Sequence, residues 1–265
     1  MSKNIIEGRC RICGEYGPLS FEHIPPRAAF NNRRVIVANL EHSASLGPDE
    51  VVRGTIQQKG SGKYSLCPRC NNNTGSWYGN QFVDWCYQAM QILLKANGKP
   101  SLIYLHYVFP LPIIKQIITM FFSVNGERFG KVNQELVDFV LNKEKRYLSP
   151  KYRIFVYYNI EGRFRTSGIS AIVNVKDPGK ISVLSEINFP PFGYIMTFDS
   201  DPPDTRLFEI THFSRYEFRE WTPMELKLPV LPTHLALPGD YRTKNEIEKQ
   251  YQENVSRERN LFEKK

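Results

Sequence analysis

The feature that most constrains the fold of this chain is a set of two cysteine pairs, each with two residues between the cysteines. Cys10 and Cys13 form the first pair, and Cys67 and Cys70 form the second. Two cysteines spaced in this way can both reach one ion, and four thiolates form the closed tetrahedral cage that suits structural zinc. We therefore expect one structural Zn2+ bound by these four cysteines.

The apolar segments and the remaining cysteine indicate where the protein resides. Five cysteines, four of them in metal-type pairs, fit a reducing compartment better than a disulfide-linked secreted scaffold. No run of eighteen apolar residues occurs, and Met1 to Glu7 lack the apolar stretch of a signal peptide. Cys86 lies on an apolar helical stretch and is predicted to be a buried packing residue. These features predict a cytoplasmic protein without a membrane span.

Residues 1–75 are poor in long apolar runs and rich in Gly, Pro, Asn, Arg and Cys. Such a segment buries too little surface to fold by hydrophobic burial alone, so a bound metal is expected to supply folding energy. Gly14 follows the first pair and is expected to take the positive φ of a zinc-knuckle turn. Leu19–Ile24 is predicted to be a short strand that ends at Pro25.

A helix is predicted from Ser76 to Ala96, because apolar residues recur there at helical spacing and Asn97-Gly98 ends the pattern. The polar segment Asn71–Gly75 is expected to provide the N-cap of this helix. The predicted buried face consists of Phe82, Trp85, Cys86, Ala89, Leu93 and Leu94.

The pattern changes near residue 99, where we expect a domain boundary between a zinc module (residues 1–99) and an α+β domain (residues 100–265). In the second domain, apolar runs predict a strand, two helices, and then strands separated by turns such as Asp177-Pro178-Gly179. These elements are the strand Ser101–Phe109, the helices Pro112–Val124 and Lys131–Leu141, and the strands Arg153–Tyr158, Phe164–Val175, Ile181–Ile187, Tyr194–Phe198 and Leu207–Phe213.

Residues 240–265 carry dense mixed charge around a narrow apolar stripe that includes Ile247, Tyr251 and Val255. This pattern is typical of an amphipathic helix, and we expect it to dock on its own protein or on a partner. The role predicted for residues 100–265 is targeting, oligomerisation or regulation, through a second copy of the chain or a regulatory partner.

The formal net charge of +8 is concentrated in the N-terminal part, because residues 1–100 hold 12 Lys and Arg against 7 Asp and Glu. Zinc bound by four thiolates would lower this excess by about two charges. The remaining positive balance favours a polyanion as partner. The candidate contacts to nucleic acid are Arg27, Arg33, Arg34, Lys59 and Lys63.

Between and just after the cysteine pairs stand Glu22-His23 and Asn71, a carboxylate, an imidazole and an amide. With these residues, Cys10–Gly75 resembles an HNH endonuclease of the ββα-metal type, in the zinc-stabilised subgroup with two CxxC pairs. The resemblance covers about a quarter of the chain. It implies an N-terminal ββα-metal module. The apolar pattern of the remaining chain predicts that helices and a mainly antiparallel β domain follow it. Members of the family also carry a central asparagine shortly before the second pair, where this chain has Gly62-Lys63-Tyr64-Ser65.

The resemblance implies a role for each polar residue of the motif. Glu22 and Asn71 would hold one catalytic Mg2+ or Mn2+, with Asn73 as the alternative if the helix starts later. His23 would deprotonate the attacking water. Oxygen ligands suit Mg2+ or Mn2+, and an imidazole with a pKa of about 6.5 can act as a base at neutral pH. On a strand, Glu22 and His23 point to opposite faces, which favours different roles for the two.

The activity implied by the resemblance is metal-dependent hydrolysis of phosphodiester bonds, with DNA favoured over RNA as substrate and bacterial defence as the expected setting. One alternative is a zinc-dependent nucleic-acid-binding module that has lost catalysis. Another is that the C-terminal β domain senses a ligand or partner that switches a nuclease on.

Overall fold

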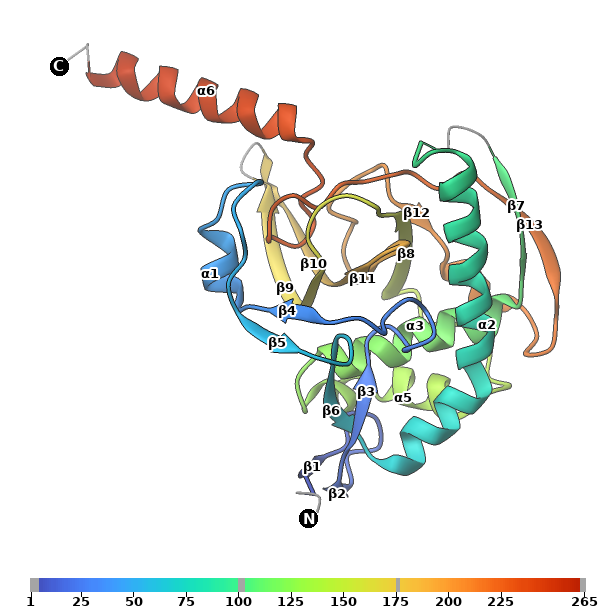
Figure 1. The fold of residues 1–265 in the computed structure, drawn as a ribbon. Coiled ribbons are helices and arrows are strands. Elements are labelled where there is room, and N and C mark those ends of the chain that lie inside the picture. Colours follow the sequence, from blue (N-terminus) through green and yellow to red (C-terminus); the bar gives the residue numbers. More distant parts are fainter. Residues whose placement is uncertain (1–4, 100–102, 175–176, 263–265) are drawn as a thin grey trace.

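Helices and short strand pairs make up the first half of the chain, and one larger sheet occupies the second half (Figure 1). The computed structural model describes residues 5–99, 103–174 and 177–262. All ladders of the named strands in these residues are antiparallel, so the predicted α+β class is confirmed. No helix within them is long and apolar enough to cross a bilayer.

The first half contains three two-stranded ladders. They are β1 (Glu7–Arg9) with β2 (Tyr16–Pro18), β3 (Ser20–His23) with β6 (Gly62–Leu66), and β4 (Val35–Val37) with β5 (Thr55–Gln57). The short helix α1 (Leu40–Ala44) lies between β4 and β5 in the sequence. The predicted strand Leu19–Ile24 is confirmed as β3, which ends before Pro25.

Helix α2 spans Pro68–Lys95 and begins well before the predicted start at Ser76. Pro68 occupies the first helical turn, where its missing N–H costs nothing and its fixed φ suits a helix. The N-cap is Cys67, whose Sγ accepts a hydrogen bond from the Cys70 backbone N–H. The prediction that Asn71–Gly75 caps the helix is therefore wrong, and these residues lie inside the first turns.

The predicted buried face of α2 is confirmed except at its end. Phe82, Trp85, Cys86 and Ala89 are buried, as is Leu93. Leu94 is 67% exposed and does not belong to this face.

Three further helices follow α2; the first is buried along its whole length, whereas the second and third are buried on one side only. They are α3 (Pro110–Val124), α4 (Phe129–Val132) and α5 (Gln134–Leu141). The predicted single helix Lys131–Leu141 is interrupted at Asn133, whose φ of −123° and ψ of 54° are not helical. The Asn133 side chain donates to the Phe129 carbonyl, which stabilises the break between α4 and α5.

The main sheet has five strands in the order β12-β8-β11-β10-β9, and a separate ladder joins β7 to β13. The bounds are β7 (Tyr104–Val108), β8 (Tyr152–Tyr158), β9 (Arg165–Asn174), β10 (Asp177–Phe189), β11 (Phe192–Phe198), β12 (Phe208–Glu209) and β13 (Thr222–Leu226).

Most of the strands predicted in the second half are confirmed, with two corrections. The predicted turn Asp177–Gly179 is wrong, because these residues already belong to β10 and Asp177 pairs with Asn174. The strand predicted at Leu207–Phe213 is too long. Only Phe208–Glu209 form a strand (β12), and a 3-10 helix at Thr211–Arg215 follows it. Residues 101, 102 and 175 of the predicted strands lie outside the described residues.

The hydrophobic core continues from the first half into the second. Trp85 of α2 stacks on Phe192 of β11 with ring centroids 4.8 Å apart, and its indole N–H donates to the Tyr194 hydroxyl. One buried cluster includes Cys10 near the N-terminus and Leu228 beyond β13. The boundary near residue 99 stays a prediction.

Helix α6 (Lys244–Phe262) confirms the predicted C-terminal helix and extends away from the rest of the molecule (Figure 1). Tyr251 on its predicted stripe is 61% exposed. The Lys244 ammonium near the start of α6 forms an ion pair with Asp49, at 2.5 Å.

Candidate metal centre and hydrolytic site

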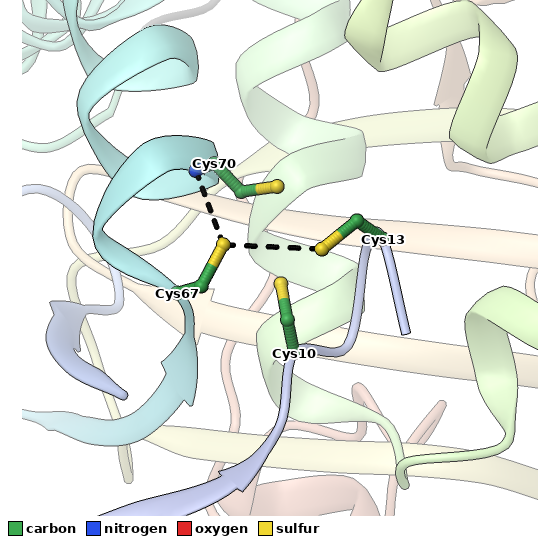
Figure 2. Close-up of side chains that lie close together, drawn as sticks. All are labelled: Cys10, Cys13, Cys67 and Cys70. Carbon is green, nitrogen blue, oxygen red and sulfur yellow. Dashed lines mark hydrogen bonds between the residues drawn. The ribbon is translucent and has the colours of Figure 1, made fainter. Parts of the chain in front are cut away.

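The four paired cysteines meet between the β1–β2 turn and the start of α2 (Figure 2). The Gly14 N–H donates to the Cys10 carbonyl, and the Cys10 N–H donates to the Glu15 carbonyl, which closes a tight turn around the first pair. Gly14 has a φ of 74°, as predicted for this turn. The second pair is held by the first turn of α2, in which Cys67 is the N-cap.

The spacing of the sulfur atoms fits a tetrahedral zinc site. The ligand atoms of Cys10, Cys13, Cys67 and Cys70 all lie within 4.8 Å of one another. The Sγ atoms of Cys13 and Cys67 are 3.8 Å apart (Figure 2), and a tetrahedron with Zn–S bonds of about 2.3 Å has edges of about 3.8 Å. The four cysteines can therefore hold one metal ion such as zinc, and soft thiolates favour Zn2+ over Mg2+.

The thiols influence one another strongly at this distance. A hydrogen bond from the Cys70 thiol lowers the pKa of Cys10 to about 4, although burial opposes this effect. Burial, together with the charge on Cys10, raises the pKa of Cys13 to about 11. Four thiolates in this space need a cation between them, which is the condition that a bound divalent metal satisfies.

Next to the cysteines, the antiparallel β3–β6 ladder and α2 form a unit of two strands and one helix (Figure 1). Glu22 lies opposite Lys63 in the ladder, and His23 lies opposite Gly62. The Asn71 amide nitrogen donates to Ser20 Oγ at 3.0 Å, which ties the first turns of α2 to β3. Side chains alternate along the regular part of β3, so Glu22 and His23 lie on opposite faces, and the ladder has a register shift between Ser20 and Phe21.

Glu22 is a buried carboxylate, only 7% exposed. Burial raises its pKa to about 7, and within the described residues Glu22 forms no ion pair that offsets this effect. A buried carboxyl group without a partner is either protonated or paired with a cation. Glu22 can therefore serve as an oxygen ligand, although the only group of His, Cys, Asp and Glu arranged for a metal in the described residues is the cysteine set.

The substitution Glu22→Gln is expected to change how the stability of the protein depends on pH. With a folded-state pKa raised from 4.5 to about 7, the stability that protonated Glu22 contributes is complete below pH 4.5 and is lost as the pH rises through 7. Ionisation of buried Glu22 costs about 3 kcal/mol at pH 8. The variant should be more stable than wild type by about that amount at pH 8 without added divalent ions, and similar at pH 4.5.

Urea unfolding at both pH values would measure this difference, with Glu7→Gln on exposed β1 as the matched control. An equal pH dependence in wild type and Glu22→Gln would contradict the prediction.

His23 is partly buried, with one ring nitrogen fixed by the main chain. Its Nε2 lies 3.1 Å from the Lys59 carbonyl oxygen, and its ring packs edge-on against Phe21 with centroids 5.0 Å apart. When Nε2 donates its hydrogen to this carbonyl, Nδ1 carries the lone pair that can accept a proton. Burial and then the positive charge of Arg27 lower the pKa of His23, so the ring is neutral at pH 7.

The five predicted contacts to nucleic acid lie at different places. Arg27 acts electrostatically on His23, and exposed Lys59 provides the carbonyl that holds the ring. The side chain of Lys63 is partly buried, and burial followed by repulsion from Arg11 lowers its pKa. Arg33 and Arg34 are exposed directly before β4.

Asn31 is a residue that sequence reasoning missed. It is fully buried between the segment after β3 and the segment before β6. Its amide nitrogen donates to the Pro25 and Ser61 carbonyls at 2.7 Å each, and its Oδ1 accepts from the Ser61 N–H. Asn31 thereby fixes the loop that carries Lys59 beside His23. Its sequence context, one of two adjacent asparagines in a polar loop, contains no signal of this role.

The substitution Asn31→Ala is expected to destabilise the protein by about 2–4 kcal/mol, because it removes three hydrogen bonds and leaves buried backbone groups unpaired. Thermal or urea unfolding would measure the loss. Asn32→Ala is the matched control, since Asn32 is adjacent and exposed. Equal stability of the two variants would contradict the role assigned to Asn31.

Comparison of this chain with protein-family models, with curated proteins and with solved structures gave no match.

Proposed function

We propose that this protein is a metal-dependent endonuclease of the HNH type, which hydrolyses phosphodiester bonds of nucleic acid, with DNA favoured over RNA. The observation that carries the proposal is the two-strand and helix unit beside the four-cysteine site. Its strand β3 bears Glu22 and His23, and the first turns of its helix bear Asn71. The hydrogen bond from Asn71 to Ser20 joins the two elements next to Glu22.

In this proposal His23 is the general base. The hydrogen bond between Nε2 and the Lys59 carbonyl orients the ring and leaves Nδ1 to accept the proton of the attacking water. Because the pKa of His23 is lowered, the ring is already in the basic form at neutral pH. Positive charge from Arg27 beside it favours the approach of an anionic phosphodiester.

Glu22 and Asn71 are the proposed ligands of a catalytic Mg2+ or Mn2+. Asn71 uses its amide nitrogen on Ser20, which leaves its carbonyl oxygen for a cation. The ionised form of Glu22, costly to bury alone, would be stabilised by the same cation. Such an ion would act as a Lewis acid toward the phosphate oxygens. The zinc proposed at the cysteines would have a structural role and would hold the β3–β6 ladder and α2 in register.

The resemblance to HNH enzymes also suggests a bacterial defence role in the cytoplasm, and residues 100–265 would then supply targeting, oligomerisation or regulation. These points belong to the proposal alone.

The alternative function is a zinc-dependent nucleic-acid-binding module without catalysis. One observation favours it. In the described residues, neither Glu22 nor His23 belongs to a cluster of His, Cys, Asp and Glu side chains that could hold a metal.

The test is cleavage by the full-length, zinc-loaded protein. Supercoiled plasmid, single-stranded DNA and RNA would each be incubated with Mg2+, with Mn2+, or without divalent ions. The expected result is cutting that requires added Mg2+ or Mn2+, with plasmid DNA among the substrates. Binding without cutting under every condition would overturn the nuclease and support the alternative.

A further inference from the structure

A positively lined pocket lies on the side of the cysteine site where the zinc-knuckle turn meets α4. Its volume is about 570 Å3, and one wall is formed by residues 9–14. The other wall comes from Glu127, Arg128, Lys131 and Gln134, which belong to the segment predicted as the second domain (residues 100–265). None of the five cations predicted from the sequence as nucleic-acid contacts lines it.

The two walls are held together by close main-chain packing. A side chain at Gly130 of α4 would clash with the Arg11 and Ile12 carbonyl oxygens, so only glycine allows this approach. The Arg11 N–H donates to the Ser65 carbonyl of β6, and the Arg11 side chain donates to the Ser123 carbonyl of α3. The pocket is therefore part of the fold, and the hydrogen bond from Arg11 to Ser65 connects it to the β3–β6 ladder that carries Glu22 and His23.

The charge of the pocket favours an anion. Arg9, Arg11, Arg128 and Lys131 line it against the single carboxylate of Glu127. A zinc tetrathiolate would contribute about two negative charges, which leaves a positive balance. Arg128 and Lys131 are exposed, so their positive charges are available to a ligand and do not serve only to offset the negative charge of the metal centre.

We propose that this pocket binds a phosphate group, and that the group is a backbone phosphate of the nucleic acid. The inference rests on the proposed function for the identity of the polymer. This assignment extends the proposed interface from the β3–β6 ladder to residues 9–14 and α4, so that segments of both predicted domains contact the substrate. Guanidinium and ammonium groups around a cavity are the usual means of binding phosphate without reading the base sequence.

The test measures binding rather than cleavage, so that it can succeed or fail independently of the nuclease activity. The affinity of the full-length protein for a fluorescein-labelled 24-base-pair duplex would be measured by anisotropy without added Mg2+ or Mn2+, over a series of NaCl concentrations. The variant is Arg128→Glu/Lys131→Glu. The control is Lys249→Glu/Arg257→Glu, which makes the same change in net charge at exposed positions of α6.

The pocket variant is expected to bind the duplex about tenfold more weakly than wild type. The slope of its log affinity against log NaCl concentration should become shallower by an amount that corresponds to about two lost phosphate contacts. The α6 variant should stay near wild type in both quantities. Equal losses in both variants, or no loss in the pocket variant, would overturn the proposal. The milder pair Arg128→Gln/Lys131→Gln replaces the first variant if its zinc content or melting temperature falls.

Competition by free pyrophosphate at constant ionic strength distinguishes a backbone phosphate of nucleic acid from a small phosphate compound as the ligand of the pocket. Weak competition by pyrophosphate against the duplex is expected for a backbone site. Tight binding of pyrophosphate that only the pocket variant loses, with duplex affinity unchanged, would assign the pocket to a small phosphate compound and overturn the backbone assignment.

Discussion

Replacement of Cys70 by serine is expected to abolish zinc binding and to unfold the N-terminal part of the chain. Cys70 is a buried member of the four-cysteine site and lies in the first turn of α2. Structural zinc contributes about 10–16 kcal/mol of apparent binding free energy at pH 7, whereas whole domains unfold at a cost of only about 5–15 kcal/mol. The strands near this site are short, so little other burial can replace the metal.

Zinc content by elemental analysis and thermal unfolding by circular dichroism would measure this loss. The expected result is one zinc per wild-type chain, none in Cys70→Ser, and a melting temperature lower by tens of degrees or no cooperative transition for the variant. Cys86→Ala is the matched control, because Cys86 is buried but lies outside the site. It should keep the zinc. A Cys70→Ser protein that melts like wild type would show that the cysteines have no structural metal.

Replacement of His23 by alanine is expected to lower the rate of phosphodiester cleavage by about 10²–10⁴-fold, the usual contribution of a general base. Zinc content and melting temperature should stay near those of wild type, since the ring makes one hydrogen bond to the Lys59 carbonyl and is partly exposed. His42→Ala is the control, because His42 is exposed on α1.

The pH profile gives a second measurement of the same role. Because burial and Arg27 lower the pKa of His23 below 6.5, the wild-type rate should rise with pH on a limb whose midpoint lies below 6.5, and stay level at neutral pH. The residual activity of His23→Ala should lack this limb. Cleavage by His23→Ala at the wild-type rate would exclude the residue as the base.

The features that could be predicted from the sequence are those that depend on local spacing. Two pairs of cysteines predict a metal site without knowledge of the fold, and the apolar period of α2 predicts the buried Trp85 and Phe82. The start of α2 was missed because Cys67 serves both as candidate metal ligand and as N-cap. A sequence pattern that assigns one role to each residue places the cap among the asparagines that follow.

The features that were missed depend on contacts between distant segments. Asn31 and Ser61 are 30 positions apart, and only the closed loop between β3 and β6 brings them together. The pocket between residues 9–14 and α4 has the same origin, because Arg11 and Lys131 belong to segments that the sequence assigns to different predicted domains. In both cases the residue types are ordinary, and their significance comes from the tertiary arrangement.

The length of α2 limits how this protein can be divided for engineering. Its 28 residues form one continuous helix of about 42 Å measured along the helix axis. The cysteine site lies at one end of this helix, and Trp85 lies further along it in the shared core. Truncation after Gly75 would remove most of α2. Truncation after residue 99 would expose Trp85, because it would remove Phe192 and Tyr194. The segment Cys10–Gly75 is therefore not expected to fold when it is transferred alone to another protein. Chimeras should exchange it together with α2 and the sheet against which α2 is packed.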